Sequence, residues 1–138
     1  MQRAAFVRVN RAMNAVVRRL GLRRFRGADL LMLTTTGRRT GQRRTTPLTY
    51  LRRDSDWVVV ASNGGADWEP GWWLNLRAGH PGTVEVDGRA VEVRGSEVVG
   101  AEREPLWREL NDRVFDYDGY QSKVSRQIAV VVLTPVTA

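Results

Sequence analysis

The chain has 138 residues, an apolar fraction of 42% and no cysteine, which describes a single domain with one hydrophobic core. The lack of cysteine excludes disulfides and thiolate chemistry, and His80 is the only histidine, so a Ser-His-Asp triad or a histidine-rich metal site is improbable. The net charge of +7 is unevenly placed: residues 1–53 hold fourteen arginines against one acidic residue, Asp29, which indicates an anionic partner for this half.

The first expected element is an amphipathic basic helix over residues 5–20, where apolar residues recur at three- and four-residue steps and arginines lie between them. Two interpretations stay open. The helix packs on the rest of the domain, which we favour slightly, or it lies on anionic lipid as a peripheral membrane contact. The arginines make it unlike a signal peptide or a membrane span, so we expect a cytoplasmic protein, with the inner membrane face as the alternative.

Runs rich in apolar and β-branched residues predict about six antiparallel strands, separated by glycine-containing turns. These runs are residues 30–36, 44–51, 57–62, 83–86, 90–99 and 128–133. Helices are expected over residues 70–77 and 100–115. Hairpins in place of βαβ crossovers predict a mainly β fold, an antiparallel barrel with flanking helices. We expect one domain over residues 1–138, with a basic lead-in at 1–27 and the barrel at 28–138.

A candidate anion site is the turn at residues 37–41, which lies between two predicted strands. Backbone amides of the turn and the guanidinium groups of Arg38, Arg39, Arg43 and Arg44 have the right chemistry to bind a phosphate or a carboxylate. A solvated hairpin turn has the same composition, and the spacing alone does not separate the two interpretations.

Three further segments have the composition of a ligand pocket. Residues 61–65 form a polar, glycine-rich bend after a strand, and three tryptophans between positions 68 and 73 are suited to packing on a flat ring or in the core. Tyr117 and Tyr120 lie near the expected end of a helix, either at a pocket mouth or as partly exposed tyrosines.

Several motifs follow one another in the order and spacing found in one known family. They are residues 30–48, 60–65 and 72–76, then Tyr117, Tyr120 with Gln121, and residues 128–135. Together they resemble the deazaflavin-dependent nitroreductase family over roughly residues 28–135. Several motifs in one order are far more specific than any single motif.

The resemblance implies a split β-barrel oxidoreductase that binds coenzyme F420, an 8-hydroxy-5-deazaflavin with a phosphodiester and an oligoglutamate tail. It implies hydride transfer to a small conjugated electrophile, namely a quinone, an enone or lactone, or a nitroaromatic, with no metal. By similarity, the anionic tail is held by Arg38, Arg39, Thr40, Gly41 and Arg44. Thr45, Thr46, Pro47 and Leu48 run beside the cofactor, Ala61, Ser62, Asn63 and Gly64 border the deazaflavin, and Trp72, Asn75 and Leu76 support the pocket.

The same resemblance places Ser62, Tyr117 and Tyr120 near the acceptor as candidate catalytic residues. We expect Tyr120 to donate or orient a proton and Ser62 to polarise the acceptor oxygen. The sequence departs from the family at three positions: Arg43 stands where proline is frequent, Asn63 where lysine is common, and Val114 where some members have tyrosine. These changes bear on the acceptor range more than on cofactor binding, so nitroimidazole reduction is not assumed.

Two other functions compete with this one. Related split barrels bind FMN, and such a protein would keep most of these residues. A basic nucleic-acid-binding module would explain the charge and the tryptophans, but the sequence has no recognisable nucleic-acid motif and we expect no nucleic-acid partner. The sequence does not fix the oligomeric state, with a monomer slightly favoured.

Overall fold

Strands make up most of the described chain. The structure is a computed structural model that describes residues 24–25 and 28–136; the helix expected over residues 5–20 lies outside them. The strands are β1 (Arg24–Phe25), β2 (Ala28–Thr36), β3 (Arg43–Thr49), β4 (Leu51–Arg53), β5 (Asp56–Val60), β6 (Gly82–Val86), β7 (Arg89–Glu97) and β8 (Val130–Pro135). The helical segments are η1 (Asn63–Gly65), α2 (Gly71–Arg77), η2 (Gly100–Glu102), α3 (Arg103–Arg113) and α4 (Tyr117–Gln121).

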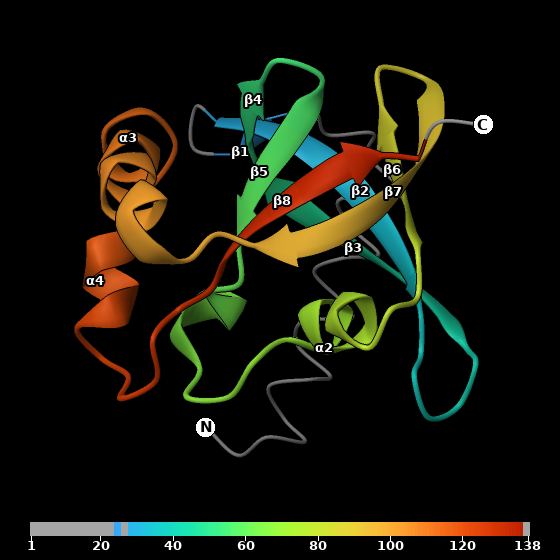
Figure 1. Cartoon of the computed structure of the whole chain (residues 1–138), viewed down its shortest axis with the longest axis horizontal. Helices are drawn as coiled ribbons and strands as arrows, with labels where there is room; N and C mark the ends of the chain where they lie inside the picture. The colour runs from blue at the N-terminus through green and yellow to red at the C-terminus, as the bar shows by residue number, and fades with distance from the viewer. Residues whose placement is uncertain (1–23, 26–27, 137–138) are drawn as a thin grey trace.

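The sheet curls into a half-barrel. Every strand pair among the described residues is antiparallel, and the strand order is β2-β6-β7-β8-β5-β4. Strand β3 pairs with β2 on the side away from β6, and β1 pairs with the first residues of β2. The two edge strands, β3 and β4, follow one another in the chain and are joined only by Tyr50, so the sheet must turn back on itself to bring them together (Figure 1). The predicted mainly β fold with an antiparallel barrel is confirmed.

The described sheet has eight strands, two more than the sequence predicted. The run expected as one strand over residues 44–51 breaks at Tyr50, because the residues before it pair with β2 and those after it pair with β5. β1 is a two-residue strand that precedes the first predicted run. Both extra strands are too short to give a periodic signal in the sequence.

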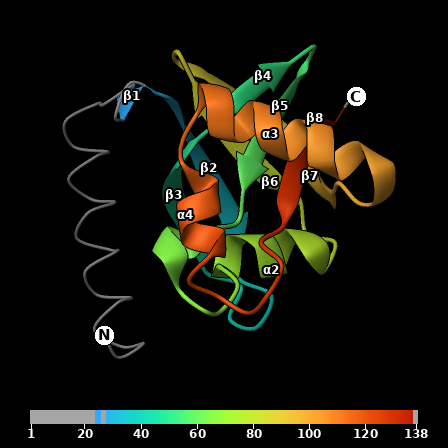
Figure 2. The ribbon, with the colours of Figure 1, turned by 90° about the vertical axis from the view of Figure 1, so that its left-hand side faces the viewer.

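Strands β5 and β8 are buried on both faces, which explains their continuous apolar runs. Trp57 and Val59 point into the barrel interior, whereas Val58 and Val60 belong to a second core under α3 and α4. The alternation follows from the two-residue period of a strand. Figure 2 shows α3 lying across the outer face of these strands.

Helix α2 closes one end of the barrel, as its apolar residues predict. Trp73 and Leu76 are buried in the barrel interior. Leu76 comes close to two strands at glycines: a Cβ on Gly95 would lie 2.9 Å from Cδ1 of Leu76, and one on Gly82 would lie 3.3 Å from its Cδ2. Glycine at these positions therefore lets the helix approach the sheet.

The helix expected over residues 100–115 is the 3-10 turn η2 followed by α3, which ends at Arg113. The short helix α4 was not predicted, because five residues that include Gly119 give little helical periodicity. The Asp116 side chain caps α4 by accepting a hydrogen bond from the Gly119 amide at 3.1 Å. No helix among the described residues is both long and apolar enough to cross a bilayer.

Candidate active site

The hairpin turn between β2 and β3 is closed by its own backbone. The Gly37 amide donates to the Gln42 carbonyl at 2.8 Å, and the Gly41 amide donates to the Gly37 carbonyl at 2.9 Å. Gly41 adopts a φ of 71°, which favours glycine. Arg38 and Arg39 lie at the tip of the turn and are exposed.

A buried asparagine on α2 anchors this turn to the barrel. Oδ1 of Asn75 accepts hydrogen bonds from the backbone amide of Arg38 at 3.0 Å and from its Nη1 at 3.2 Å. Nδ2 of Asn75 donates to Oγ1 of Thr35 at 3.0 Å, and both of these side chains are buried. Asn75 therefore holds both the backbone and one guanidinium nitrogen of Arg38, although Arg38 as a whole is exposed.

Replacing Asn75 with alanine is expected to lower the free energy of unfolding by about 1–3 kcal/mol, because buried partners lose their hydrogen bonds. It should also weaken anion binding at the turn, because Arg38 loses its anchor. Chemical denaturation and cofactor titration measure the two effects. Asn111→Ala is the matched control: it removes one hydrogen bond within α3 and one between α3 and α4, away from the turn, and should lower stability without changing cofactor affinity. Equal affinity losses in both variants would contradict the anchoring role.

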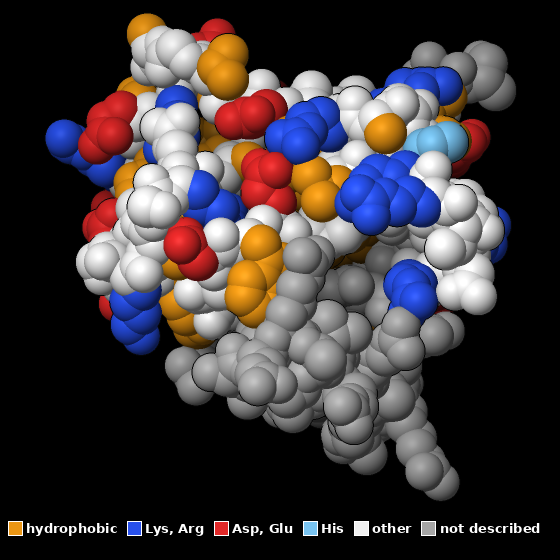
Figure 3. Space-filling model, turned by 90° about the horizontal axis from the view of Figure 1, so that it is seen from below, with side chains coloured by type: hydrophobic (Ala, Val, Ile, Leu, Met, Phe, Trp, Pro, Cys, Tyr) orange, Lys and Arg blue, Asp and Glu red, His pale blue; other side chains and the backbone are white. Residues whose placement is uncertain are grey.

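The arginines of the hairpin are not neutralised within the described part of the chain. Arg38, Arg39, Arg43 and Arg44 are exposed, and none of them forms an ion pair with a described carboxylate. No acidic residue occurs anywhere from residue 30 to residue 53. Figure 3, which views the molecule from below, shows basic side chains with few acidic ones on the right, whereas both kinds alternate on the left. An anion approaching the turn thus meets an uncompensated positive field.

Strand β3 leads away from the turn at one edge of the described sheet. Among the described strands it pairs only with β2. The hydroxyl groups of Thr45 and Thr34 are 2.7 Å apart, which ties the start of β3 to its partner. Thr46, Pro47 and Leu48 follow and are partly buried.

The loop after β5 is sharply bent. Asn63, Gly64 and Gly65 have successive φ values of 52°, 62° and 86°, a left-handed run that is costly for residues other than glycine. Nδ2 of Asn63 donates to the Trp68 carbonyl at 3.0 Å, so this side chain holds the loop. Ser62 is partly buried at the start of the bend.

Tyr120 lies beside this loop. A Cβ on Gly65 would be 3.0 Å from Cδ1 of Tyr120, so a larger residue at position 65 would displace the ring. The ring also stacks on Phe115, with 5.5 Å between ring centroids and 20° between ring planes. The structure thus brings Tyr120 to the Ser62 loop, as the catalytic hypothesis requires, and its hydroxyl forms no hydrogen bond with a described residue.

Tyr117, on the same helix, is in a different environment. Only 4% of its surface is exposed, and it belongs to the core under α3 and α4. Its hydroxyl and Oγ1 of Thr49 on β3 are 2.7 Å apart. Burial raises the pKa of Tyr117 to about 12, and the hydrogen bond with Thr49 opposes this shift. A direct role for Tyr117 at the acceptor remains a prediction.

The raised pKa predicts a loss of stability at alkaline pH. Native Tyr117 keeps its proton above pH 10, where the unfolded chain releases it. Its contribution to the unfolding free energy is therefore complete below pH 10 and is lost as the pH rises to about 12. The expected loss is about 2–3 kcal/mol of unfolding free energy. Urea denaturation across this range tests it. The unfolding free energy should fall more steeply with pH in wild type than in Tyr117→Phe. The comparison isolates Tyr117, because burial also raises the pKa of Tyr50.

The other predicted pocket residues differ in burial. Trp72 and Leu76 are 8% and 3% exposed and lie in the barrel interior. Ala61 is fully buried at the end of β5, whereas Thr40 and Gly64 are exposed.

Sequence reasoning missed Arg126. Its guanidinium group donates to the carbonyls of Ala61, Ser62 and Ala66 at 3.2, 3.2 and 3.0 Å, which surround the bent loop. It occurs in a polar stretch with no periodicity or motif that would distinguish it. A cavity of about 350 Å³ borders this arginine, away from the hairpin turn.

Comparisons with known proteins identify the family and the fold. The model of the F420H(2)-dependent quinone reductase family matches residues 5–135. An F420H(2)-dependent quinone reductase of Mycobacterium tuberculosis is 40% identical over 107 residues, which are 75% of this chain and 72% of that protein. The solved structure of an F420-H2 dependent reductase (FDR-A) has a TM-score of 0.67 and 30% identity, over 75% of this chain and 92% of that one. A domain-swapped dimer has a TM-score of 0.68 and 26% identity, over 91% of this chain and 98% of that one.

The fold and the sequence together define a split-barrel oxidoreductase that uses a deazaflavin cofactor. More narrowly, the chain belongs to the F420H(2)-dependent quinone reductase family. Its cofactor is coenzyme F420, and its reaction is hydride transfer to a small quinone-like acceptor. The site fits that cofactor, because the hairpin arginines lack described acidic partners and the cofactor carries a polyanionic tail.

Proposed function

We propose that this chain carries out its hydride transfer at the end of the barrel closed by α2, with the cofactor tail on the hairpin turn and the deazaflavin beside the Ser62 loop. The observation that carries the proposal is the uncompensated arginine turn, which Asn75 anchors to the barrel. In this arrangement Arg38, Arg39 and Arg44 bind the anionic tail, Thr40 offers its backbone amide, and Gly41, whose amide is bonded to the Gly37 carbonyl, keeps the turn in shape. In this proposal β3 runs between the turn and the ring site.

The chemistry at the acceptor follows from the same placement. When bound, the reduced deazaflavin supplies a hydride. The Ser62 hydroxyl donates a hydrogen bond to the acceptor oxygen and draws electron density away from the carbon skeleton. Tyr120 donates a proton to the acceptor oxygen as negative charge develops there, because its hydroxyl has no hydrogen bond within the described chain. Tyr117 holds α4 against β3 through Thr49 and thereby keeps Tyr120 in place.

Fluorescence titrations of the protein with oxidised and reduced coenzyme F420, and separately with FMN, test the cofactor site. We expect F420 to bind and FMN to bind weakly or not at all, since FMN lacks the oligoglutamate tail. Stopped-flow oxidation of the bound reduced cofactor by a water-soluble quinone, with a nitroaromatic in parallel, then tests the acceptor. Preferential binding of FMN would overturn the cofactor assignment, and oxidation by the nitroaromatic alone would overturn the quinone assignment.

The membrane contact and the cytoplasmic location remain predictions. The segment proposed to touch the membrane, residues 5–20, lies outside the described residues. Deleting residues 1–20 separates the two interpretations of this segment. Loss of binding to anionic liposomes with an unchanged melting temperature supports the lipid contact, and a lowered melting temperature with no liposome binding in either protein supports a packing role.

A further inference from the structure

Arg126 joins the Ser62 loop to the segment that follows α4. One guanidinium nitrogen, Nη1, donates to the Ala61 carbonyl at 3.2 Å, and the other, Nη2, is shared between the carbonyls of Ser62 at 3.2 Å and Ala66 at 3.0 Å. Its Nε is inaccessible to solvent and has no partner among the described residues. A single side chain therefore spans both ends of the bent loop.

The bend itself makes this contact important. Strand β5 ends at Val60, one further backbone hydrogen bond joins Ala61 to Ala129, and the left-handed run from Asn63 to Gly65 then turns the chain sharply. The only described backbone hydrogen bonds that start and end within the bend are the short ones from Gly65 to Ser62 and from Ala66 to Asn63, at 3.0 and 3.1 Å. Charge-assisted hydrogen bonds from a guanidinium group are stronger than these.

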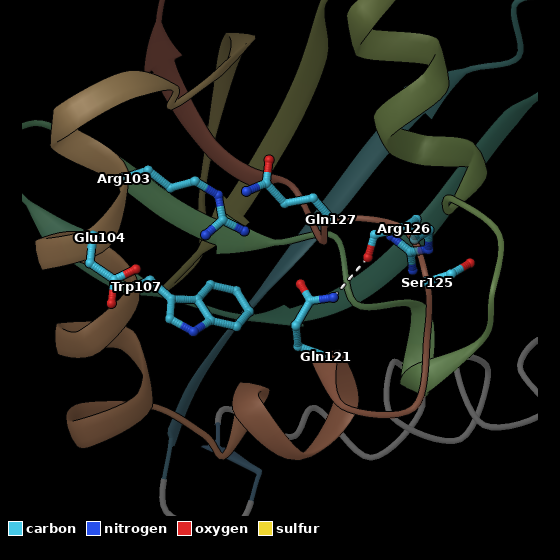
Figure 4. Close-up of a pocket in the computed structure, with 7 residues that line it drawn as sticks. All are labelled: Arg103, Glu104, Trp107, Gln121, Ser125, Arg126 and Gln127. Carbon is cyan, nitrogen blue, oxygen red and sulfur yellow. Dashed lines mark hydrogen bonds between the residues drawn. The ribbon is translucent and has the colours of Figure 1, made fainter.

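The backbone around Arg126 is in turn fixed to α4. Nε2 of Gln121 donates to the Arg126 carbonyl at 2.7 Å, and Oε1 of Gln121 accepts from the Ile128 amide at 2.9 Å. Figure 4 shows Gln121 projecting from α4 toward this carbonyl. The Ser125 amide donates to Oδ1 of Asp67, which lies just beyond the loop, at 3.2 Å. Arg126 is thus attached to the helix that carries Tyr120.

We propose that Arg126 is a positioning residue that holds the Ser62 loop and Tyr120 in the relative arrangement needed for hydride transfer. This inference rests on the proposed function, since it assigns both residues to the acceptor. Burial lowers the pKa of Arg126, with the nearby Glu69 and Asp67 opposing the shift. An arginine cannot be deprotonated at neutral pH, so it acts by geometry and charge and not by proton transfer.

Lysine cannot replace this geometry. Its single ammonium group is a point charge, whereas the planar guanidinium presents donors in fixed directions to carbonyls on both sides of the loop. We expect Arg126→Lys and Arg126→Ala each to reduce kcat by about tenfold to a hundredfold, in keeping with the cost of a small misplacement of reacting groups. The Kd for F420 should change by less than about threefold, because the tail binds at the hairpin turn.

The test uses chemical rescue, which the cavity beside Arg126 makes possible. This space of about 350 Å³ is lined by Arg126, Gln121 and Trp107 and gives a free guanidinium ion access to the vacated position in Arg126→Ala. Guanidinium below denaturing concentrations should restore kcat, and sodium chloride at equal ionic strength should not. Arg108→Ala is the matched control, because Arg108 is an exposed arginine of α3 paired with Glu104 at 3.2 Å.

A readout without cofactor completes the test. Hydrogen exchange in residues 61–66 should be faster in Arg126→Ala and in Arg126→Lys than in wild type and Arg108→Ala, and guanidinium should slow it again in Arg126→Ala. Wild-type exchange with wild-type kcat in both Arg126 variants would overturn the inference, and so would a loss of kcat that guanidinium does not restore. A wild-type protein that binds F420 but reduces no quinone would contradict the proposed function, while the exchange measurement would still report on the Arg126 contact.

Discussion

Replacing Arg38 and Arg44 together with alanine is expected to raise the Kd for coenzyme F420 by about a hundredfold at low salt. Each charge-assisted contact is worth about 1.5–3 kcal/mol, and we take the lower end because both side chains are exposed. Two such contacts amount to about 3 kcal/mol, and 1.4 kcal/mol corresponds to a factor of ten. Fluorescence titration of the cofactor at two ionic strengths measures the effect.

The salt dependence identifies the cause. Wild-type affinity should fall as salt rises, whereas the variant should respond less, because screening acts on charges that the variant lacks. The control is Arg108→Ala with Arg113→Ala, which removes the same charge from α3, where the two side chains pair with Glu104 and Glu109. An equal loss of affinity in both double variants would mean that net charge alone attracts the cofactor, and unchanged affinity would contradict the tail assignment.

Tyr120→Phe is expected to slow quinone reduction by about a hundredfold, the lower end of what a positioned general acid contributes. Phenylalanine keeps the ring that contacts Phe115 and Gly65, so only the hydroxyl is lost. The Kd for F420 and the melting temperature should stay close to wild type. Single-turnover oxidation of the reduced cofactor, measured apart from binding, isolates the affected step.

Tyr117→Phe provides the comparison within the same helix. It removes a hydroxyl that is bonded to Thr49 and buried, so it should lower stability and affect turnover less than Tyr120→Phe does. If Tyr117→Phe slows turnover as much as Tyr120→Phe, the proton-donor role of Tyr120 is wrong. A parallel loss of cofactor affinity in Tyr120→Phe would lead to the same conclusion.

The fold was largely predictable because its patterns are local. Apolar and β-branched runs marked the long strands, and Pro70 and Gly79 marked the limits of α2. The break at Tyr50 was not predictable, because the residues on its two sides are both suited to strands and differ only in their pairing partners. Partner choice depends on distant parts of the chain, which periodicity does not report.

The parts of the candidate site that are marked by their amino-acid composition were predictable from the sequence. The parts that depend on a single contact between distant residues were not. The arginine turn was evident from its charges. The contact between Arg126 and the loop joins residues about sixty positions apart, and nothing near Arg126 in the sequence indicates it. The burial of Tyr117 was also hidden, since a tyrosine next to aspartates is equally suited to the surface.

The pairing of β5 with β8 bears on how the protein forms during synthesis. Val60 pairs with Val130, so both hydrophobic cores are incomplete until β8 has been synthesised and has left the ribosome. Pairings this distant in sequence are slow to form, and until then the apolar faces of β5 are open to other chains. Newly made protein is therefore expected to depend on chaperones, and a nonsense mutation upstream of β8 should yield aggregate in place of a shortened enzyme.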